Sequence, residues 1–311
     1  MRYRHLFGPV PSRRLGASLG VDLVPHKVCS MDCVYCECGP TTRLTVDRAE
    51  YVPTTDVLSE IDDCLGRGPL PDFVTFSGSG EPTLHSGIGT VIRHLKDRWK
   101  APVALLTNAT LMPDPAVRRD LLPLDLVVPS LDAALPDSFA RVNRPHPDVR
   151  CDGVIDGLAA FRREYAGPIW LEVFVVDPVN TGEADLAALQ GALDRIHPDR
   201  VQINSLDRPG TETWVRKTPL PVLEALAAKL RHPRVEIISR FRERVEYHAF
   251  RDDVAEAILE TVSRRPCTLD DLSVSLGLHA LEARKYLDIL EAEKRLRAEL
   301  GERGVFYRLN R

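Results

Sequence analysis

The sequence lacks long apolar runs, a strong net charge and a regular cysteine pattern, and each absence argues against a class of protein. No stretch of its 311 residues approaches the roughly 18 consecutive apolar residues of a membrane-spanning helix, and the N-terminal segment has no apolar core typical of signal peptides. Lys and Arg number 41 against 45 Asp and Glu, so no general basic field draws the chain to nucleic acid or to anionic membranes. We therefore expect a cytoplasmic protein with no membrane partner.

Cysteine is scarce, but its distribution is informative. Most of the 7 cysteines lie within the segment VCSMDCVYCECGP, residues 28–40, whereas Cys64, Cys151 and Cys267 are scattered. An odd number with this crowding does not match the disulfide framework of a secreted protein. In a reducing compartment, such a crowd usually indicates a bound metal.

Short β-branched runs alternate with amphipathic segments along most of the chain, without an internal repeat of fixed period. The runs predict strands near residues 18–24, 73–76, 103–107, 126–130, 169–176, 201–205 and 235–239. The segments between them predict helices near residues 54–66, 86–98, 115–122, 152–163, 183–195 and 219–231. Because strands separated by helices form parallel sheets with right-handed crossovers, we expect an α/β fold, a partial (β/α)6-type TIM barrel of parallel strands.

The pattern changes in the last part of the chain. Three helices and then a hairpin are predicted over residues 252–265, 268–277, 279–294 and 296–309. Three helices followed by a β-ribbon form the layout of a small winged-helix domain. We therefore expect two domains, a barrel over residues 1–245 and a winged-helix-like domain over residues 246–311.

The unusual segments of the sequence follow the predicted barrel strands, where the chemistry of such barrels lies. The cysteine segment follows the first strand and SGSGEPTLH (77–85) follows the second. NAT (108–110), SLDA (130–133) and NSLDRPG (204–210) follow the third, fourth and sixth strands. The sequence therefore predicts one functional rim.

Three cysteines of the crowded segment have a spacing that suits metal binding. Cys29, Cys33 and Cys36 are spaced C-x3-C-x2-C, and Cys38 adds a thiol two residues later. A structural zinc site takes its ligands in pairs from two separated knuckles, and only Cys33 and Cys36 form such a pair. Free or redox-active thiols are another alternative, although several exposed thiols in one loop are prone to oxidation. Three thiolates on one loop also suit a [4Fe–4S] cluster whose fourth iron stays open to another ligand.

This loop resembles the signature of the radical S-adenosylmethionine (SAM) enzymes, which have the same spacing after the first strand of a partial barrel and an aromatic residue, here Tyr35, before the third cysteine. FSGSGEPTLH and DRVQINSLDRPGTETWV resemble, more narrowly, a subgroup of iron–sulfur oxidoreductases related to the tRNA wyosine-forming enzymes. The resemblance implies that Cys29, Cys33 and Cys36 hold a [4Fe–4S] cluster and that SAM is the second cofactor. It further implies reductive cleavage of SAM to a 5′-deoxyadenosyl radical, which removes a hydrogen from a substrate.

The resemblance also implies residues that contact SAM. In the family a Gly-Gly-Glu turn binds the SAM amino group through its backbone, whereas this chain has Ser79-Gly80-Glu81. From the residues alone, the glycines equally suit an ordinary tight turn, and a carboxylate inside a barrel strand must be paired, because an isolated buried charge is costly. The candidate SAM contacts are Gly78, Gly80, Glu81, Asn108, Ser130, Asp132, Glu172 and Asn204.

Basic side chains before the first strand and on the rim loops are candidates for substrate binding, although each one alone is as often a surface or structural residue. They are Arg13, Arg14, Lys27, His146 and Arg208. The wyosine kinship suggests RNA as the substrate, whereas the acidic balance leaves a peptide or a small metabolite open. Because the sequence has no second cluster motif, we expect the electron to come from an external donor of the flavodoxin or ferredoxin type.

The predicted winged helix lacks the charge of a DNA reader. Its expected recognition helix over residues 279–294 carries fewer basic than acidic side chains, namely Arg284, Lys285 and Lys294 against Glu282, Asp288, Glu291 and Glu293. We therefore expect it to contact protein rather than DNA. Three hypotheses follow for the whole chain: a radical SAM enzyme, an iron–sulfur or SAM-dependent redox sensor or regulator that binds DNA or protein through the winged helix, and a zinc-bound scaffold.

Overall fold

The computed structural model describes residues 3–12, 14–206, 210–238, 254–278, 283, 286–287, 290–301 and 304–310. Two candidate substrate contacts, Arg13 and Arg208, lie outside the described residues, as does the predicted boundary between residues 245 and 246. The remaining candidate residues can be placed in the fold.

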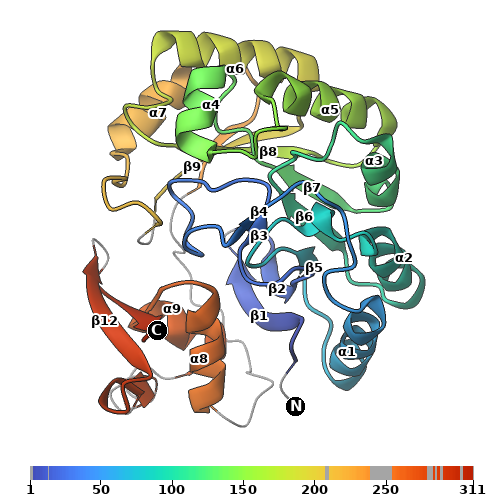
Figure 1. Ribbon diagram of the computed structural model, residues 1–311, viewed down its shortest axis with the longest axis vertical. Coiled ribbons are helices and arrows are strands. Elements are labelled where there is room, and N and C mark those ends of the chain that lie inside the picture. The colour runs from blue at the N-terminus through green and yellow to red at the C-terminus, as the bar shows by residue number, and fades with distance from the viewer. Residues whose placement is uncertain are drawn as a thin grey trace.

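A parallel array of strands forms the centre of the larger unit (Figure 1). Its first sheet has the order β1 (Leu6–Ser12), β2 (Gly16–Val21), β5 (Phe73–Phe76), β6 (Val103–Thr107) and β7 (Leu126–Pro129), in which β1 pairs antiparallel with β2 and the other neighbours pair in parallel. The second sheet has the order β10 (Val235–Ile237), β9 (Arg200–Ser205) and β8 (Trp170–Val175). Parallel bridges from Val127 to Ile169 and from Ser130 to Glu172 join β7 to β8, so the sheets continue into one another. Within the described residues no pairing joins β10 to β1, so the barrel is partial.

Helices follow the parallel strands and cover the outer face of the array (Figure 1). They are α1 (Thr54–Arg67), α2 (Ile88–Arg98), α3 (Pro115–Leu121), α4 (Pro136–Asn143), α5 (Cys151–Glu164), α6 (Glu183–Ile196) and α7 (Leu220–Lys229). Each of the parallel strands β2, β5, β6, β7, β8 and β9 is thus followed by a helix, which confirms the predicted α/β fold with a parallel sheet. In the described part of the chain, no helix is long and apolar enough to cross a membrane.

The sequence patterns missed β1 and α4, for physical reasons. β1 reads LFGPVPS, and its prolines and glycine argue against a strand, but an edge strand tolerates proline because one row of its amides needs no partner. α4 has 8 residues, too few for a clear helical period, and it starts with Pro136 in its first turn.

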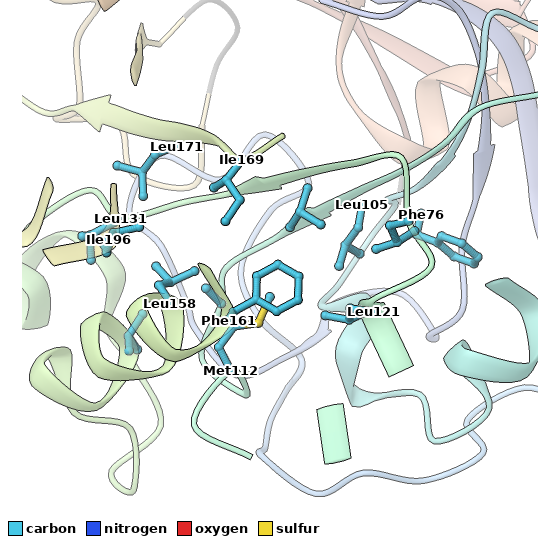
Figure 2. Close-up of a cluster of buried hydrophobic side chains, with 14 of the residues drawn as sticks. Phe76, Leu105, Met112, Leu121, Leu131, Leu158, Phe161, Ile169, Leu171 and Ile196 are labelled. Carbon is cyan, nitrogen blue, oxygen red and sulfur yellow. The ribbon is translucent and has the colours of Figure 1, made fainter. Parts of the chain in front are cut away.

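The main core lies between the array and its helices (Figure 2). Leu105 points from β6 toward Leu121 of α3, and Phe76 of β5 lies beside Leu105 (Figure 2). Ile169, Leu171 and Leu158 of α5 belong to the same cluster. All of these side chains are buried. The core therefore occupies the outer face of the strands and leaves the rim loops available for chemistry.

The C-terminal part of the chain forms a smaller unit with its own apolar core. It contains α8 (Val254–Arg264), β11 (Cys267–Thr268), α9 (Leu269–Leu276), β12 (Leu296–Gly301) and β13 (Gly304–Leu309). The strands pair antiparallel in the order β11, β13, β12, and α9 packs against β1 of the larger unit. Much of the expected helix over 279–294 lies outside the described residues, so the winged helix stays a prediction.

Candidate active site

Two short strands that pair with each other close the cysteine loop on the rim. Cys29 ends the short strand β3 (Val28–Cys29), which pairs in parallel with β4 (Arg43–Leu44) after the loop returns. The Cys36 amide donates to the Cys33 carbonyl at 3.1 Å, and the Thr45 amide donates to the Cys29 carbonyl at 3.0 Å. Cys29, Cys33, Cys36 and Cys38 form no disulfide with one another. The backbone thus holds the three signature thiols on one short, closed loop.

Each signature thiol accepts a hydrogen bond from a side chain of a different segment. Asn108 Nδ2 lies 3.5 Å from Cys29 Sγ, and Asn143 Nδ2 lies 3.4 Å from Cys33 Sγ. Lys27 Nζ lies 3.0 Å from Cys36 Sγ. Because N–H donors stabilise negative charge on sulfur, these contacts favour thiolates, the form that binds metal.

The thiols differ in acidity in the metal-free protein. Burial raises the pKa of Cys29 to about 12, and burial together with the Asp132 carboxylate raises the pKa of Cys33 well above its usual value. A hydrogen bond with the Cys38 thiol, with a further contribution from Lys27, lowers the pKa of Cys36 to about 6. Cys38 lies beside Cys36, and its Sγ is 3.7 Å from the Gly78 carbonyl oxygen.

The glycine turn over residues 77–81 is bonded directly to the segment that enters the cysteine loop. The Lys27 amide donates to the Ser79 carbonyl at 3.0 Å, and the Glu81 amide donates to the Val28 carbonyl at 3.1 Å. A Cβ at Gly80 would lie 2.0 Å from the Val28 carbonyl oxygen, so only glycine permits this approach. The turn is therefore fixed beside the start of the cysteine loop.

Glu81 joins this turn to the end of β6. Its buried carboxylate accepts hydrogen bonds from the Thr83 amide at 3.0 Å and from the Thr83 and Thr107 hydroxyls at 2.6 and 2.7 Å. Its other oxygen accepts a hydrogen bond from the backbone amide of Asn108 at 2.8 Å. Since both oxygens are engaged by protein donors, this side chain positions Asn108, while a role in SAM binding through its backbone stays a prediction.

Asp132 makes a second buried network beside Cys33. Its Oδ2 accepts from the Tyr35 hydroxyl at 2.5 Å and from Asn143 Nδ2 at 2.6 Å, and its Oδ1 accepts from the Phe174 amide at 2.8 Å. The Tyr35 ring stacks on Phe174 with 3.7 Å between ring centroids. The aromatic residue of the loop is therefore held by the fourth and fifth parallel strands, and Asp132 positions it.

Glu172 points to the inner face of the barrel. Along β8 its neighbours Leu171 and Val173 belong to the main core, whereas Phe174, on the same face as Glu172, contacts Tyr35. Glu172 forms an ion pair with Arg14, and the two side chains are 16% and 10% exposed. The carboxylate inside the barrel is thus paired with an arginine from the segment between β1 and β2.

The other predicted residues lie along the same edge of the sheet. Ser130 follows β7, and its amide donates to the Thr107 carbonyl at 2.9 Å. Asn204, near the end of β9, is buried, and its Oδ1 accepts from the Ser205 amide at 3.0 Å. The His146 amide donates to the Ser30 carbonyl at 2.9 Å, which attaches its loop to the cysteine loop. Contacts of these side chains with a cofactor or substrate stay predictions.

Sequence reasoning left two residues of this site out of the candidates. Asn143, the last residue of α4, reaches Cys33 and Asp132, and its helix was not predicted. Asp22 directly follows β2, and its Oδ2 accepts from the Ser79 amide at 3.1 Å and the Ser79 hydroxyl at 2.6 Å. A single acidic residue in the apolar run SLGVDLV was the available signal for Asp22.

The donor set fits a [4Fe–4S] cluster. Among the residues that the structure describes, no group of His, Cys, Asp and Glu side chains converges to hold a single metal ion. A cube does not require such convergence, because each thiolate binds a different iron. Hydrogen bonds from outer residues to the sulfurs, as Asn108, Asn143 and Lys27 make here, are the contacts that adjust the potential of such clusters.

Comparisons with known proteins bear on the family of this chain. The family model of the radical SAM superfamily matches residues 23–189. A UPF0026 protein of Methanocaldococcus jannaschii is 32% identical over 266 residues, which cover 84% of this chain and 82% of that protein. A protein of Brachyspira hyodysenteriae called GTPase Obg is 38% identical over 208 residues, 67% of this chain but only 31% of that protein, so the chain spans less than a third of this relative.

A solved structure shows the same fold. Streptococcus suis SuiB bound to S-adenosylmethionine matches with a TM-score of 0.52 and 17% identity, over 70% of this chain and 49% of that chain. The family match spans more than half of the sequence and includes both the cysteine loop and the glycine turn. The chain belongs to the radical SAM superfamily.

Proposed function

We propose that this chain is an enzyme that holds a [4Fe–4S] cluster through Cys29, Cys33 and Cys36 and cleaves SAM reductively, so that a hydrogen can be removed from a substrate. One observation carries the proposal: each of these thiols, on one loop of the rim, accepts a hydrogen bond from its own side-chain donor. Ordinary surface thiols have no need of three such donors from three segments.

Enzymes of this superfamily use a [4Fe–4S] cluster and SAM as cofactors. When bound, the cluster supplies the electron for SAM cleavage. The chain's own residues would hold the thiolates through Asn108, Asn143 and Lys27 and would present the backbone of residues 78–81 to SAM. Support for the second role comes from the backbone hydrogen bonds of Lys27 to Ser79 and Glu81 to Val28, which fix the turn beside the cysteine loop.

The substrate is proposed to enter the barrel and meet polar groups on its inner face. The Arg14–Glu172 ion pair supports this, because a charged pair inside a barrel offers both a cation and an anion to a polar substrate. A peptide, a small metabolite or RNA, which the resemblance to the wyosine-forming enzymes suggests, would each satisfy this requirement. The same proposal includes an external flavodoxin- or ferredoxin-type electron donor, a cytoplasmic location, and a winged-helix unit over residues 246–311 that contacts protein.

The test is anaerobic reconstitution with iron and sulfide, followed by a reductant and SAM. We expect 5′-deoxyadenosine to form, and we expect Cys29→Ala, Cys33→Ala and Cys36→Ala to abolish it. Cys64→Ala, a change at a half-buried thiol in α1, is the matched control and should keep full activity. A fully reconstituted protein that forms no 5′-deoxyadenosine would overturn the proposal in favour of a sensor. Stoichiometric zinc without iron would overturn it in favour of a scaffold.

A further inference from the structure

The smaller unit inserts one arginine into the rim of the larger unit. Arg264, the last residue of α8, has its Nη1 3.1 Å from Asp22 Oδ2 and its Nη2 3.4 Å from Glu260 Oε1. Its guanidinium carbon lies 4.4 Å from the centroid of the Phe7 ring. The Arg264 side chain is 17% exposed and that of Asp22 is 8% exposed, so this ion pair is largely removed from water.

The surface that receives this arginine belongs to the barrel. A Cβ at Gly20 would lie 2.1 Å from the Phe7 ring, so the ring can approach β2 this closely only because glycine is there. The ring in turn contacts the guanidinium, a favourable cation–π arrangement. Phe7 of strand β1 and Asp22, which directly follows strand β2, therefore form the surface that binds one side chain of the smaller unit.

The same carboxylate oxygen that binds Arg264 also holds the glycine turn. Asp22 Oδ2 accepts from the Ser79 amide and the Ser79 hydroxyl as well as from Arg264. Gly78 approaches so closely that a Cβ there would lie 2.3 Å from the Asp22 carboxyl carbon. Arg264 and Ser79 thus meet on one oxygen, and the position of the turn depends on a residue of the other unit.

Charge makes this dependence strong. A buried carboxylate that loses its cation must be rehydrated or must move, since an uncompensated buried charge is costly. Asp22 cannot move without shifting Ser79 and Gly78, because it touches both. Removing Arg264 should therefore disturb the turn while the anchors of the cysteine loop to Asn108 and Asn143 remain.

We propose that Arg264 is a positioning residue for the SAM site, so that the smaller unit completes the site of the barrel and its docking is coupled to SAM binding. This inference rests on the proposed function, because it takes residues 78–81 to be the SAM-binding turn. Coupling of this kind is reciprocal: docking raises the affinity for SAM, and SAM strengthens docking.

The test compares Arg264→Gln with Arg264→Lys and with Arg295→Gln. Arg295 belongs to the same unit, but it pairs with Glu256 at the surface, 2.7 Å apart with both side chains partly exposed, so it is the matched control. In equilibrium dialysis of the reconstituted protein we expect Arg264→Gln to weaken SAM binding by about tenfold at unchanged iron content. Arg264→Lys should have a SAM affinity between those of the wild type and Arg264→Gln, because it keeps the positive charge. Arg295→Gln should bind SAM with the affinity of the wild type.

Two further measurements separate positioning from loss of structure. In the metal-free protein, the Ser79 amide should exchange hydrogen faster in Arg264→Gln than in the wild type, while amides of β6 should not. In an Asp22→Asn background, Arg264→Gln should change SAM affinity by less than about twofold, because the shared carboxylate is already neutral.

The outcomes are distinguishable from failure of the proposed function. If the wild type does not bind SAM, the proposed function fails, and Ser79 exchange still tests the role of Arg264. If the wild type binds SAM and Arg264→Gln binds it equally well, this inference fails and the proposed function stands. Equal weakening by Arg264→Gln in the wild-type and Asp22→Asn backgrounds would also overturn it.

Discussion

Replacing Glu81 with glutamine should weaken the fold and the cysteine site together. The buried carboxylate receives only donors: three on Oε1, from Thr83 and Thr107, and one on Oε2, from the Asn108 amide. Glutamine has one oxygen and one NH2 group, so in its best orientation the NH2 faces the backbone N–H of Asn108. Both groups are donors, so no hydrogen bond forms between them. The link between the glycine turn and the end of β6 is then lost.

The magnitude follows from this count. One hydrogen bond to a charged acceptor contributes about 1.5–3 kcal/mol, and an unsatisfied buried amide costs about 1–3 kcal/mol. Burial raises the pKa of Glu81, because the buried site disfavours the charged carboxylate. The neutral glutamine avoids this penalty, which offsets part of the lost stability. We expect Glu81→Gln to lower the free energy of unfolding by about 2–3 kcal/mol.

Urea unfolding of the metal-free protein measures this change. Glu224→Gln, on the exposed side of α7, is the control and should change the free energy of unfolding by less than about 0.5 kcal/mol. Because Asn108 also donates to Cys29, the variant should retain less iron after reconstitution and desalting. A Glu81→Gln protein as stable as the control, with wild-type iron content, would refute this account of Glu81.

Three further changes test neighbouring parts of the site. Gly80→Ala should lower the free energy of unfolding in urea by about 2 kcal/mol, because the new Cβ would lie 2.0 Å from the Val28 carbonyl oxygen. Gly153→Ala in α5, where a Cβ would meet open space, is the control and should leave the free energy of unfolding unchanged or raise it. Equal effects of the two changes would contradict the close approach at Gly80. Burial lowers the pKa of His85 below 6.5, so the folded state holds the imidazole neutral, and the free energy of unfolding should fall as the pH drops below about 6.5, by at most ~1.4 kcal/mol per pH unit. In His85→Asn the free energy of unfolding should differ less between pH 7 and pH 5.5 than in the wild type. An unchanged difference would mean that other groups cause the pH dependence. Cys38→Ala should keep the iron content and the SAM cleavage of the wild type, since Cys38 contacts Cys36 and the Gly78 carbonyl but is not one of the three spaced ligands; loss of iron would make it a fourth ligand.

The arrangement of strands and helices was accessible from the sequence because it depends on local periodicity. The runs around 73–76, 103–107 and 201–205 became β5, β6 and β9 within a residue of the predicted bounds. β1 escaped prediction because its prolines are tolerated only at a sheet edge, and which strand forms the edge is a property of the whole sheet. α4 escaped because a helix of 8 residues has too little periodicity.

The cysteine loop could also be predicted from the sequence, because all three signature thiols lie within eight residues of one another. Their spacing therefore depends on a short stretch of chain alone. The roles of the predicted carboxylates were harder to derive. Whether Glu81 or Asp132 faces a cofactor or the protein depends on donors such as Thr107 and Phe174, which come from other strands.

Short-range chemistry therefore determines that this chain builds a loop with three closely spaced cysteines and places it after a parallel strand. Tertiary structure alone decides which donors meet the sulfurs, because Asn108 and Asn143 are distant in sequence from the cysteines that they contact. It alone also joins Arg264 to Asp22 and Ser79, since a long-range ion pair leaves no periodic pattern in the sequence. Spacing along the chain predicts which thiols bind the metal, whereas the side chains that surround these thiols are brought together only when distant segments pack.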